Sequence, residues 1–220
     1  MHARIRSGHA HPVLTPSIAL LGLAILFAVS GCGAPGSAAP GQQPSPTTDL
    51  RGLLISAASL PARFRASTGE SPAYRFTLCG VDLEPTAPVS SSSTRFARSE
   101  IGPFVEQRVR RYPDDSQRDV IAALRAALPT CASTRATDPA SPGTATPFVV
   151  RTLALRQFGE DSIAWHQEVD GERPVPTDVV LMRKGRTIVL VTSYTFEAAT
   201  DPQTILDAAA AAEAPLTRLP

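Results

Sequence analysis

Cysteine offers the clearest chemistry in this chain, and it occurs three times. Cys32 ends the stretch Val29-Ser30-Gly31-Cys32, which follows two arginines and an apolar run of about 12 residues. Basic residues, a short apolar core and a small-residue cleavage site are typical of an export signal. With cysteine directly after that site, the pattern is the lipobox of bacterial lipoproteins, whose thiol is acylated. We therefore predict a signal peptide over residues 1–31 and lipidation of Cys32.

The predicted anchor sets the expected location of the chain. The apolar run is too short for a membrane-spanning helix, which needs about 20 residues. Each buried CH2 of an acyl chain contributes about 0.8 kcal/mol, so two or three chains bind a membrane stably. We expect a protein anchored by lipid to the extracytoplasmic face of the cell membrane. An uncleaved anchor and a chance match within an ordinary secretory signal are the alternatives.

The other two cysteines, Cys79 and Cys131, are predicted to form a disulfide, because disulfides persist in an oxidising compartment. A redox-active or metal-binding pair is the alternative. Redox-active dithiols usually lie close together in sequence, and two cysteines with a single remaining histidine make a poor metal site. We favour the structural bridge and expect no metal and no cofactor.

His166 is the natural candidate for catalysis, since the other three histidines precede Cys32. A general base needs a carboxylate to orient it and a nucleophile within reach. Glu168 shares its strand face, and Ser162 and Ser193 are available, but no nucleophile-elbow motif surrounds either serine. We interpret His166 as a structural residue on a solvated or half-buried strand face and predict no enzymatic activity.

Three further polar clusters are interpreted as ordinary surface residues. Two acidic clusters could bind calcium, but they lack an EF-hand pattern. A basic cluster could face anionic lipid headgroups, but acidic residues are interleaved with it, and a serine run could be a modification site but is expected to be flexible loop. The acidic clusters are Glu160-Asp161 and Asp170-Gly171-Glu172, the basic cluster is Arg108, Arg110, Arg111 and Arg118, and the serine run is Ser90–Thr94.

Charge argues against nucleic acid as a partner. Without the two arginines of the predicted signal peptide, 19 of the 21 basic residues remain against 20 acidic ones. Nucleic-acid-binding domains usually show a strongly basic patch. Residues 32–48 are rich in glycine, proline and serine and are predicted to be the lipidated cysteine with a flexible linker. Residues 49–220 are then long enough for one extracytoplasmic domain with a real core.

Two helices are predicted from apolar spacing and end signals. The first covers about Ser116–Leu128, with one apolar stripe and Pro129 after it. The second begins at Asp201-Pro202, because proline is well tolerated at the first helical position, and Pro215 is expected to end it. A weaker helix is expected around Leu50–Leu60.

Strand patterns dominate the second half of the chain. Val179–Met182 and Thr187–Tyr194 flank a predicted tight turn, and Ile188–Val191 is apolar on both faces, as expected of a central strand. Further strands are predicted at Tyr74–Cys79, Thr94–Ser99, Phe104–Tyr112, Phe148–Leu155 and Ser162–Val169, and the segments Pro85–Ser93 and Ala132–Thr146 are expected to be polar connections. The predicted fold class is α+β, a twisted antiparallel sheet flanked by two or three helices with one disulfide.

The order of these features resembles a known family. The lipobox is followed by Leu60-Pro61, Cys79-Gly80, Tyr112-Pro113-Asp114-Asp115, Cys131, Phe158-Gly159-Glu160 and a closing helix. The chain is similar in this order to actinobacterial envelope lipoproteins with a sensor-type domain like the extracellular part of the mycobacterial serine/threonine kinase PknH. That resemblance implies a twisted antiparallel sheet bordering a cleft, with no assigned catalytic residues.

We therefore expect a non-catalytic, sensor-like module of the cell envelope that binds an unknown ligand or protein partner. A carrier of lipid or glycolipid is the alternative, and an envelope hydrolase is the least favoured reading. The membrane, through the N-terminal lipid, is the only partner that the sequence itself specifies.

Overall fold

The structure, a computed structural model, describes residues 49–68, 77–137, 145–171, 174–197 and 199–219. The predicted signal peptide, Cys32 and the linker lie outside these residues, so those predictions stay predictions. The described residues all belong to one compact unit. None of the helices in these ranges has both the length and the apolar character of a membrane-spanning segment.

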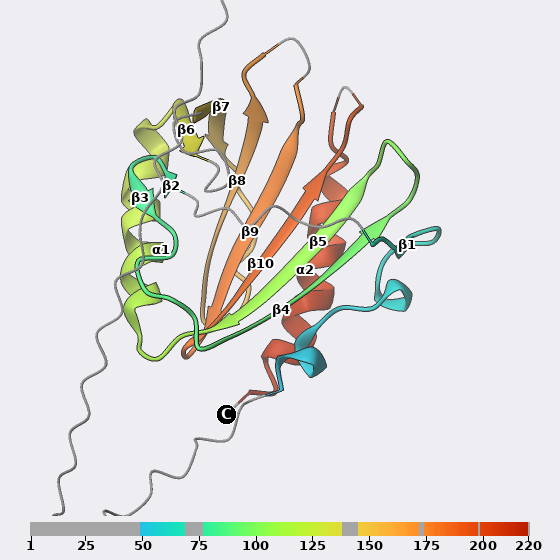
Figure 1. The fold of residues 1–220 in the computed structure, drawn as a ribbon, viewed down its shortest axis with the longest axis horizontal. Helices are drawn as coiled ribbons and strands as arrows, with labels where there is room; N and C mark the ends of the chain where they lie inside the picture. Colours follow the sequence, from blue (N-terminus) through green and yellow to red (C-terminus); the bar gives the residue numbers. More distant parts are fainter. Residues whose placement is uncertain (1–48, 69–76, 138–144, 172–173, 198, 220) are drawn as a thin grey trace, which may run out of the picture. The chain divides into compact units, whose positions relative to one another are not determined.

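One large antiparallel sheet organises the domain (Figure 1). Its strands lie in the order β1-β4-β5-β10-β9-β8-β7-β6, and a separate pair, β2 and β3, lies beside α1. The strands of the sheet are β1 (Arg65–Ala66), β4 (Ser90–Ala97), β5 (Phe104–Arg111), β6 (Ser133–Thr137), β7 (Ala145–Thr152), β8 (Asp161–Val169), β9 (Thr177–Lys184) and β10 (Thr187–Tyr194). The separate pair is β2 (Thr77–Leu78) and β3 (Val81–Asp82).

Helices cover both faces of this sheet (Figure 1). The two α-helices are α1 (Ser116–Ala127) and α2 (Pro202–Leu216), and short 3-10 turns are η1 (Leu50–Leu53), η2 (Ala57–Ser59) and η3 (Leu128–Thr130). The predicted fold class, α+β with a flanked antiparallel sheet, is confirmed.

The β9–β10 hairpin forms the centre of the sheet, as the apolar run in β10 predicts. A two-residue turn at Gly185 and Arg186 joins the strands, and Gly185 has a φ of 53°. Positive φ suits the hairpin turns whose twist matches that of the strands, and glycine adopts it without steric cost. Because side chains alternate between faces, the hairpin supplies apolar residues to both cores.

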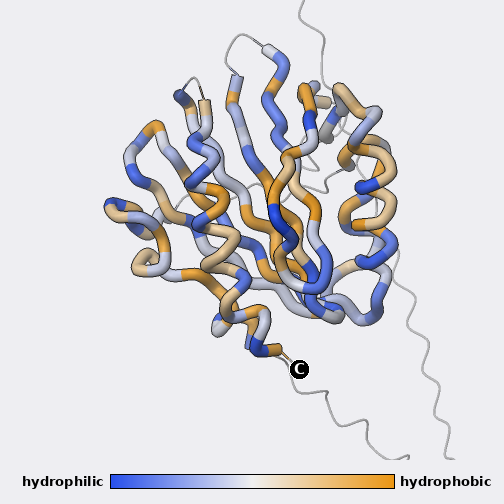
Figure 2. The backbone as a smooth tube through the Cα atoms, turned by 180° about the vertical axis from the view of Figure 1, so that it is seen from behind, coloured by the Kyte–Doolittle hydropathy of each residue, from blue (hydrophilic) through white to orange (hydrophobic). Residues whose placement is uncertain are grey.

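The α2 side of the sheet holds the larger core. Val189 of β10 lies opposite Met182 of β9, and both are fully buried beneath α2. Ala208, Ala209 and Ala212 of the helix are also fully buried. Small alanine side chains let the helix backbone approach the branched side chains of the sheet closely. Figure 2 shows these apolar segments from the α2 side.

The α1 side holds a smaller core built around Trp165 of β8. Trp165 packs in a cluster with Val179 of β9 and with Ile121 and Leu124 of α1. The predicted disulfide is present here, since Cys79 is bonded to Cys131. It joins the turn between β2 and β3 to the end of η3, so it fastens the α1 side of the domain.

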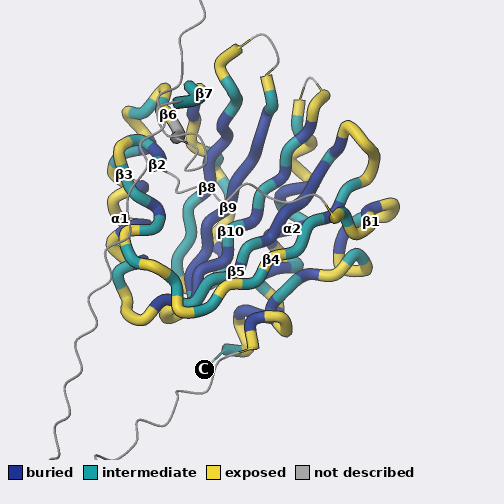
Figure 3. The backbone as a smooth tube through the Cα atoms, in the orientation of Figure 1, coloured by how far each residue is buried: buried dark blue, intermediate teal, exposed yellow. Residues whose placement is uncertain are grey.

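Several predicted boundaries are wrong. Ser90–Thr94 was expected to be flexible loop but belongs to β4, because its backbone pairs along β5 whatever the side chains are. The connection predicted at Ala132–Thr146 contains β6 and the start of β7. The helix expected at Leu50–Leu60 is two 3-10 turns, and α2 continues through Pro215 to Leu216. Figure 3 shows how burial falls from the central strands toward β4 and β7.

Candidate functional site

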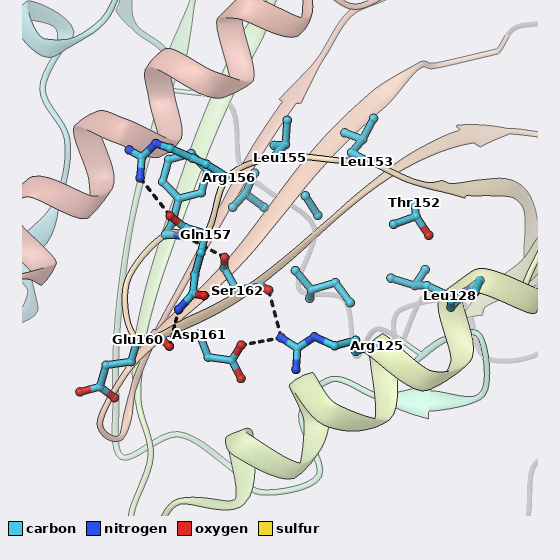
Figure 4. A pocket seen from close by; sticks show the side chains of 15 residues that line it. Arg125, Leu128, Thr152, Leu153, Leu155, Arg156, Gln157, Glu160, Asp161 and Ser162 are labelled. Atoms are coloured by element: carbon cyan, nitrogen blue, oxygen red, sulfur yellow. Dashed lines mark hydrogen bonds and ion pairs between the residues drawn. The ribbon is translucent and has the colours of Figure 1, made fainter.

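A cleft opens at the edge of β8, where the two cores of the domain meet. Its volume is about 550 Å³, within the range of about 300–1,000 Å³ typical of small-molecule sites. Apolar residues of the α2-side core line one part, among them Leu153, Leu155 and Phe158. Leu128 and Ile163 line another part and belong to the α1-side cluster. Figure 4 shows the cleft between α1 and the chain that follows β7.

The cleft exists because β7 stops pairing with β8 partway along. The paired residues end at Thr152 and Trp165, and one further hydrogen bond joins the Leu153 N–H to the Ala164 carbonyl, 3.0 Å away. On its other side β8 stays paired with β9 down to Asp161. The first residues of β8 therefore have a strand on one side and the cleft on the other.

Contacts with α2 hold the outer wall, residues 153–158, in place. Glu213 of α2 accepts hydrogen bonds from Arg156 Nη2 at 2.8 Å and from the Gly159 N–H at 2.9 Å. The guanidinium of Arg156 also lies 4.0 Å from the ring centroid of Phe158. Burial alone would raise the pKa of Glu213, but the hydrogen bonds from Arg156 and Gly159 outweigh it and leave that pKa lowered.

Charged groups surround the mouth of the cleft. Arg125 of α1 donates from Nη2 to Asp161 Oδ1 at 2.5 Å and to the Ser162 carbonyl at 3.3 Å. Its side chain is still 54% exposed. Glu160 accepts the Gly185 N–H, and this hydrogen bond lowers the pKa of its carboxyl group. The cleft thus combines apolar residues with basic and acidic ones, a combination suited to a ligand with apolar and charged parts.

His166 lies outside this cleft and is buried rather than solvated, which corrects its predicted environment. Only 6% of it is exposed, and its Nδ1 lies 2.6 Å from Oδ1 of Asp178. A carboxylate can only accept, so Nδ1 carries the proton of this hydrogen bond. Glu168, the orienting carboxylate considered from the sequence, lies farther away, 3.8 Å from Nε2. The register of β8 and β9 places His166 directly opposite Asp178.

Neither candidate serine forms a catalytic triad with His166. Ser193 of β10 lies opposite Asp178, so the aspartate stands between serine and histidine, whereas a triad needs histidine in the middle. The Oγ of Ser193 is buried and has no partner among the described residues. Ser162 lies four residues from His166 along β8, about 13 Å away, and its Oγ accepts the Phe158 N–H.

The other predicted clusters are held in ion pairs and hydrogen bonds. Glu160 contacts Arg183 and Lys184, and Asp161 contacts Arg125. Arg108 pairs with Glu106 at 2.5 Å, Arg110 pairs with Glu84, Arg111 donates to Thr187, and Arg118 lies exposed on α1. Glu172 lies outside the described residues. Over the described ranges, no group of three or more His, Cys, Asp or Glu side chains is placed to hold a metal ion.

Sequence reasoning named three residues of the cleft, Glu160, Asp161 and Ser162, but for calcium binding and catalysis, and it did not identify the others. Arg125 reaches the cleft from α1, where it contacts Asp161, whereas Arg156 of the wall is held by Glu213 of α2. Leu153 and Leu155 continue the alternation of β7 beyond its last paired residue. That alternation was the signal in the sequence for the wall of the cleft, but it predicted that β7 would continue to Leu155.

Comparison with known proteins shows a likeness of fold. No model of a protein family matches the chain, and no curated protein matches it significantly. The structure is similar to the extracellular domain of PknH from Mycobacterium tuberculosis, with a TM-score of 0.56 and 13% sequence identity, over 81% of this chain and 100% of that one. A putative uncharacterized protein from Mycobacterium smegmatis, an Rv0999 ortholog, matches with a TM-score of 0.38 and 15% identity over 71% of this chain and 92% of its own. The resemblance stated from the sequence is confirmed at the level of the fold.

Proposed function

We propose that this chain is a lipid-anchored, extracytoplasmic binding module of the cell envelope, that its ligand site is the cleft beside β8, and that it performs no catalysis. The observation that carries the proposal is the cleft itself: a preformed opening of about 550 Å³, lined by apolar and by charged or polar residues in similar measure. Sites for small molecules combine these properties, with a few polar groups fixing the orientation of the ligand.

Two further observations support the extracytoplasmic part of the proposal. The Cys79–Cys131 bridge fits an oxidising compartment, where structural disulfides form and persist. The fold is that of a domain described as extracellular. Anchoring through Cys32 rests on the lipobox alone. It is tested by Cys32→Ala, which should move the protein from the membrane fraction to the soluble fraction and abolish incorporation of labelled fatty acid.

The non-catalytic part of the proposal rests on the arrangement around His166. Its hydrogen-bond partner is Asp178, and both side chains are buried away from the cleft. Neither serine considered from the sequence is placed to be activated by the histidine ring. Substitution of His166 should therefore lower stability without removing a reaction.

Native mass spectrometry of the full chain, purified from the envelope of an oxidising host in mild detergent, tests the binding proposal. We expect a co-purifying mass of several hundred daltons that is lost on denaturation. Thr152→Trp, which places a large ring at the cleft lining, should release it. Val149→Trp is the matched control, because Val149 lies on the same strand, is 51% exposed and does not line the cleft.

Two outcomes would contradict the proposal. A mass retained equally by both tryptophan variants would place the ligand elsewhere. A diacyl lipid released by neither variant would favour a lipid carrier instead of a binding module with a small ligand.

A further inference from the structure

We infer that the ligand of this cleft is a short peptide in an extended conformation, bound as an added strand against the open edge of β8 with its free carboxylate at Arg125. This inference rests on the proposed function and names the ligand class of the same site. Three observations carry it: an unpaired strand edge, a wall held away from that edge, and a partly free guanidinium at one end.

The unpaired edge spans the start of β8. Residues 161–163 pair with β9 but have no partner in β7, whose pairing ends at Trp165 and whose last hydrogen bond is to Ala164. In an antiparallel strand, the N–H and C=O of every second residue point to the same edge. Since the Ala164 carbonyl points toward β7, the backbone N–H and C=O of Ser162 face the same way, into the cleft. The Ser162 carbonyl already accepts a hydrogen bond from Arg125 Nη2 at 3.3 Å, so an added strand would bind the Ser162 N–H and share the carbonyl with Arg125.

The outer wall, residues 153–158, is held away from β8, so the chain itself does not pair with this strand edge. After Leu153 the chain leaves β8, and Arg156 and Gly159 are fastened to Glu213 of α2. The next contact back to β8 is made by the Phe158 N–H, which donates to the Ser162 side chain rather than to its backbone. The gap between wall and strand is therefore built into the fold.

The apolar lining and the spacing fit alternate side chains of an extended segment. Residues 161–163 of β8 run beside the cleft, with the backbone groups of Ser162 facing it, and an extended peptide of three residues spans about 10 Å. Leu128 and Ile163 lie on the α1 side of the opening, and Leu155 lies on the wall. Side chains of a strand point alternately to two sides, so one would contact the α1-side residues and the next would contact the wall.

Arg125 supplies the charge that selects a carboxylate. Asp161 and the Ser162 carbonyl both bind Nη2, and the other guanidinium nitrogens of Arg125 have no partner among the described residues. A guanidinium binds a carboxylate through two parallel hydrogen bonds, which fixes both the position and the direction of the ligand. A peptide lying along β8 with its C-terminus toward α1 would present its carboxylate to this group.

Amide hydrogen exchange tests the inference on the full chain purified in mild detergent. The probes are an equimolar library of acetylated tripeptides with a free carboxyl terminus and the same library with an amidated terminus. We expect the free-acid library to slow exchange at Ser162 and Ala164, and the amidated library to act only at about tenfold higher concentration. Slowed exchange confined to these backbone positions is the result that an added strand predicts, whereas general stabilisation by a ligand would slow exchange across the domain.

Variants of Arg125 and Asp161 distinguish recognition of the peptide carboxylate from a general loss of stability. Arg125→Gln should raise the free-acid concentration needed about tenfold, equivalent to about 1.4 kcal/mol. Arg118→Gln, on the exposed face of the same helix, should leave it unchanged. Asp161→Asn removes the acidic competitor for Arg125 and should retain or strengthen free-acid binding, so it remains informative if Arg125→Gln is unstable.

The outcomes distinguish the peptide inference from the proposal that the cleft is a ligand site. If neither library slows exchange at Ser162 while the co-purifying mass is still lost in Thr152→Trp, the peptide inference is overturned and the binding cleft stands. If that mass is insensitive to Thr152→Trp and the peptides are inert, both are overturned. Equal action of free-acid and amidated peptides would overturn the role assigned to Arg125.

Discussion

The two sides of the sheet are stabilised in different ways. The α2 side buries a long helix through alanines such as Ala208 and Ala212 against the valines of the central strands. The α1 side has a smaller cluster around Trp165, a helix that contacts mainly β8, β9 and β3, and the Cys79–Cys131 bridge. The difference indicates that the larger core is sustained by burial, whereas the smaller one is reinforced covalently.

The cleft lies where these two cores meet. Phe158 and Val180 reach it from the α2-side core, and Leu128 and Ile163 reach it from the α1-side cluster. A cleft at the boundary of two separately stabilised cores can stay open, because neither core needs the residues of the cleft to pack against one another. Each side can therefore be perturbed separately, and the effect on the cleft can be compared.

Removal of the disulfide should have the largest effect. Replacing Cys79 and Cys131 with serine opens a loop whose ends are separated by 52 positions in the sequence, and the chain-entropy relation gives a loss of about 4 kcal/mol in the free energy of unfolding. Urea denaturation measures this loss. Amides of α1 should exchange faster than those of α2 in the variant, and an equal acceleration of both helices would contradict the separate stabilisation of the two sides.

Breaking the buried pair of His166 and Asp178 should have the second-largest effect on stability. Asp178→Leu leaves His166 buried without its acceptor and should cost about 1.5–3 kcal/mol. The double variant with His166→Leu should recover most of this loss, because the buried polar group is then gone. Thermal unfolding of Asp178→Leu, His166→Leu and the double variant measures the three losses. If the double variant loses the sum of the two single effects, the pair is not coupled as described.

A single alanine tests how closely α2 approaches the sheet. Ala208→Leu adds volume to a fully buried site and should cost about 1–3 kcal/mol. Ala210→Leu, on the exposed face of the same helix, should change stability by less than about 0.5 kcal/mol. Chemical denaturation of the pair gives the comparison, and similar values for both would show that the helix has room to move away.

The smallest effect concerns the wall of the cleft and depends on pH. The pKa of Glu213 lies below its usual 4.5, so its carboxylate stabilises the fold above that pH and the contribution is lost as pH falls through the lowered value. Glu213→Gln should therefore cost under about 1 kcal/mol at neutral pH and nothing in strong acid. Unfolding measured from pH 7 to pH 2 checks this, and a gap that widens on acidification would refute it.

The parts of the fold that follow from local pattern were predicted from the sequence, and those that depend on distant pairing were not. The two helices, the β9–β10 hairpin and the bridge follow from periodicity, capping and cysteine count. Ser90–Thr94 carries no apolar alternation, so its place beside β5 is set by the sheet. The His166–Asp178 contact depends on the register of two strands, and the wall of the cleft depends on Glu213, 54 residues from Gly159.

Hydrogen exchange over the whole chain, with and without the small-molecule fraction of an envelope extract, tests the central claim most directly. The account predicts that residues 153–163 gain protection in the wild-type chain and in Val149→Trp, and that Thr152→Trp abolishes the gain. Protection confined to another surface, such as the exposed Ile101 and Phe196, or a gain that persists in Thr152→Trp, would contradict the assignment of the ligand site to the β8 edge.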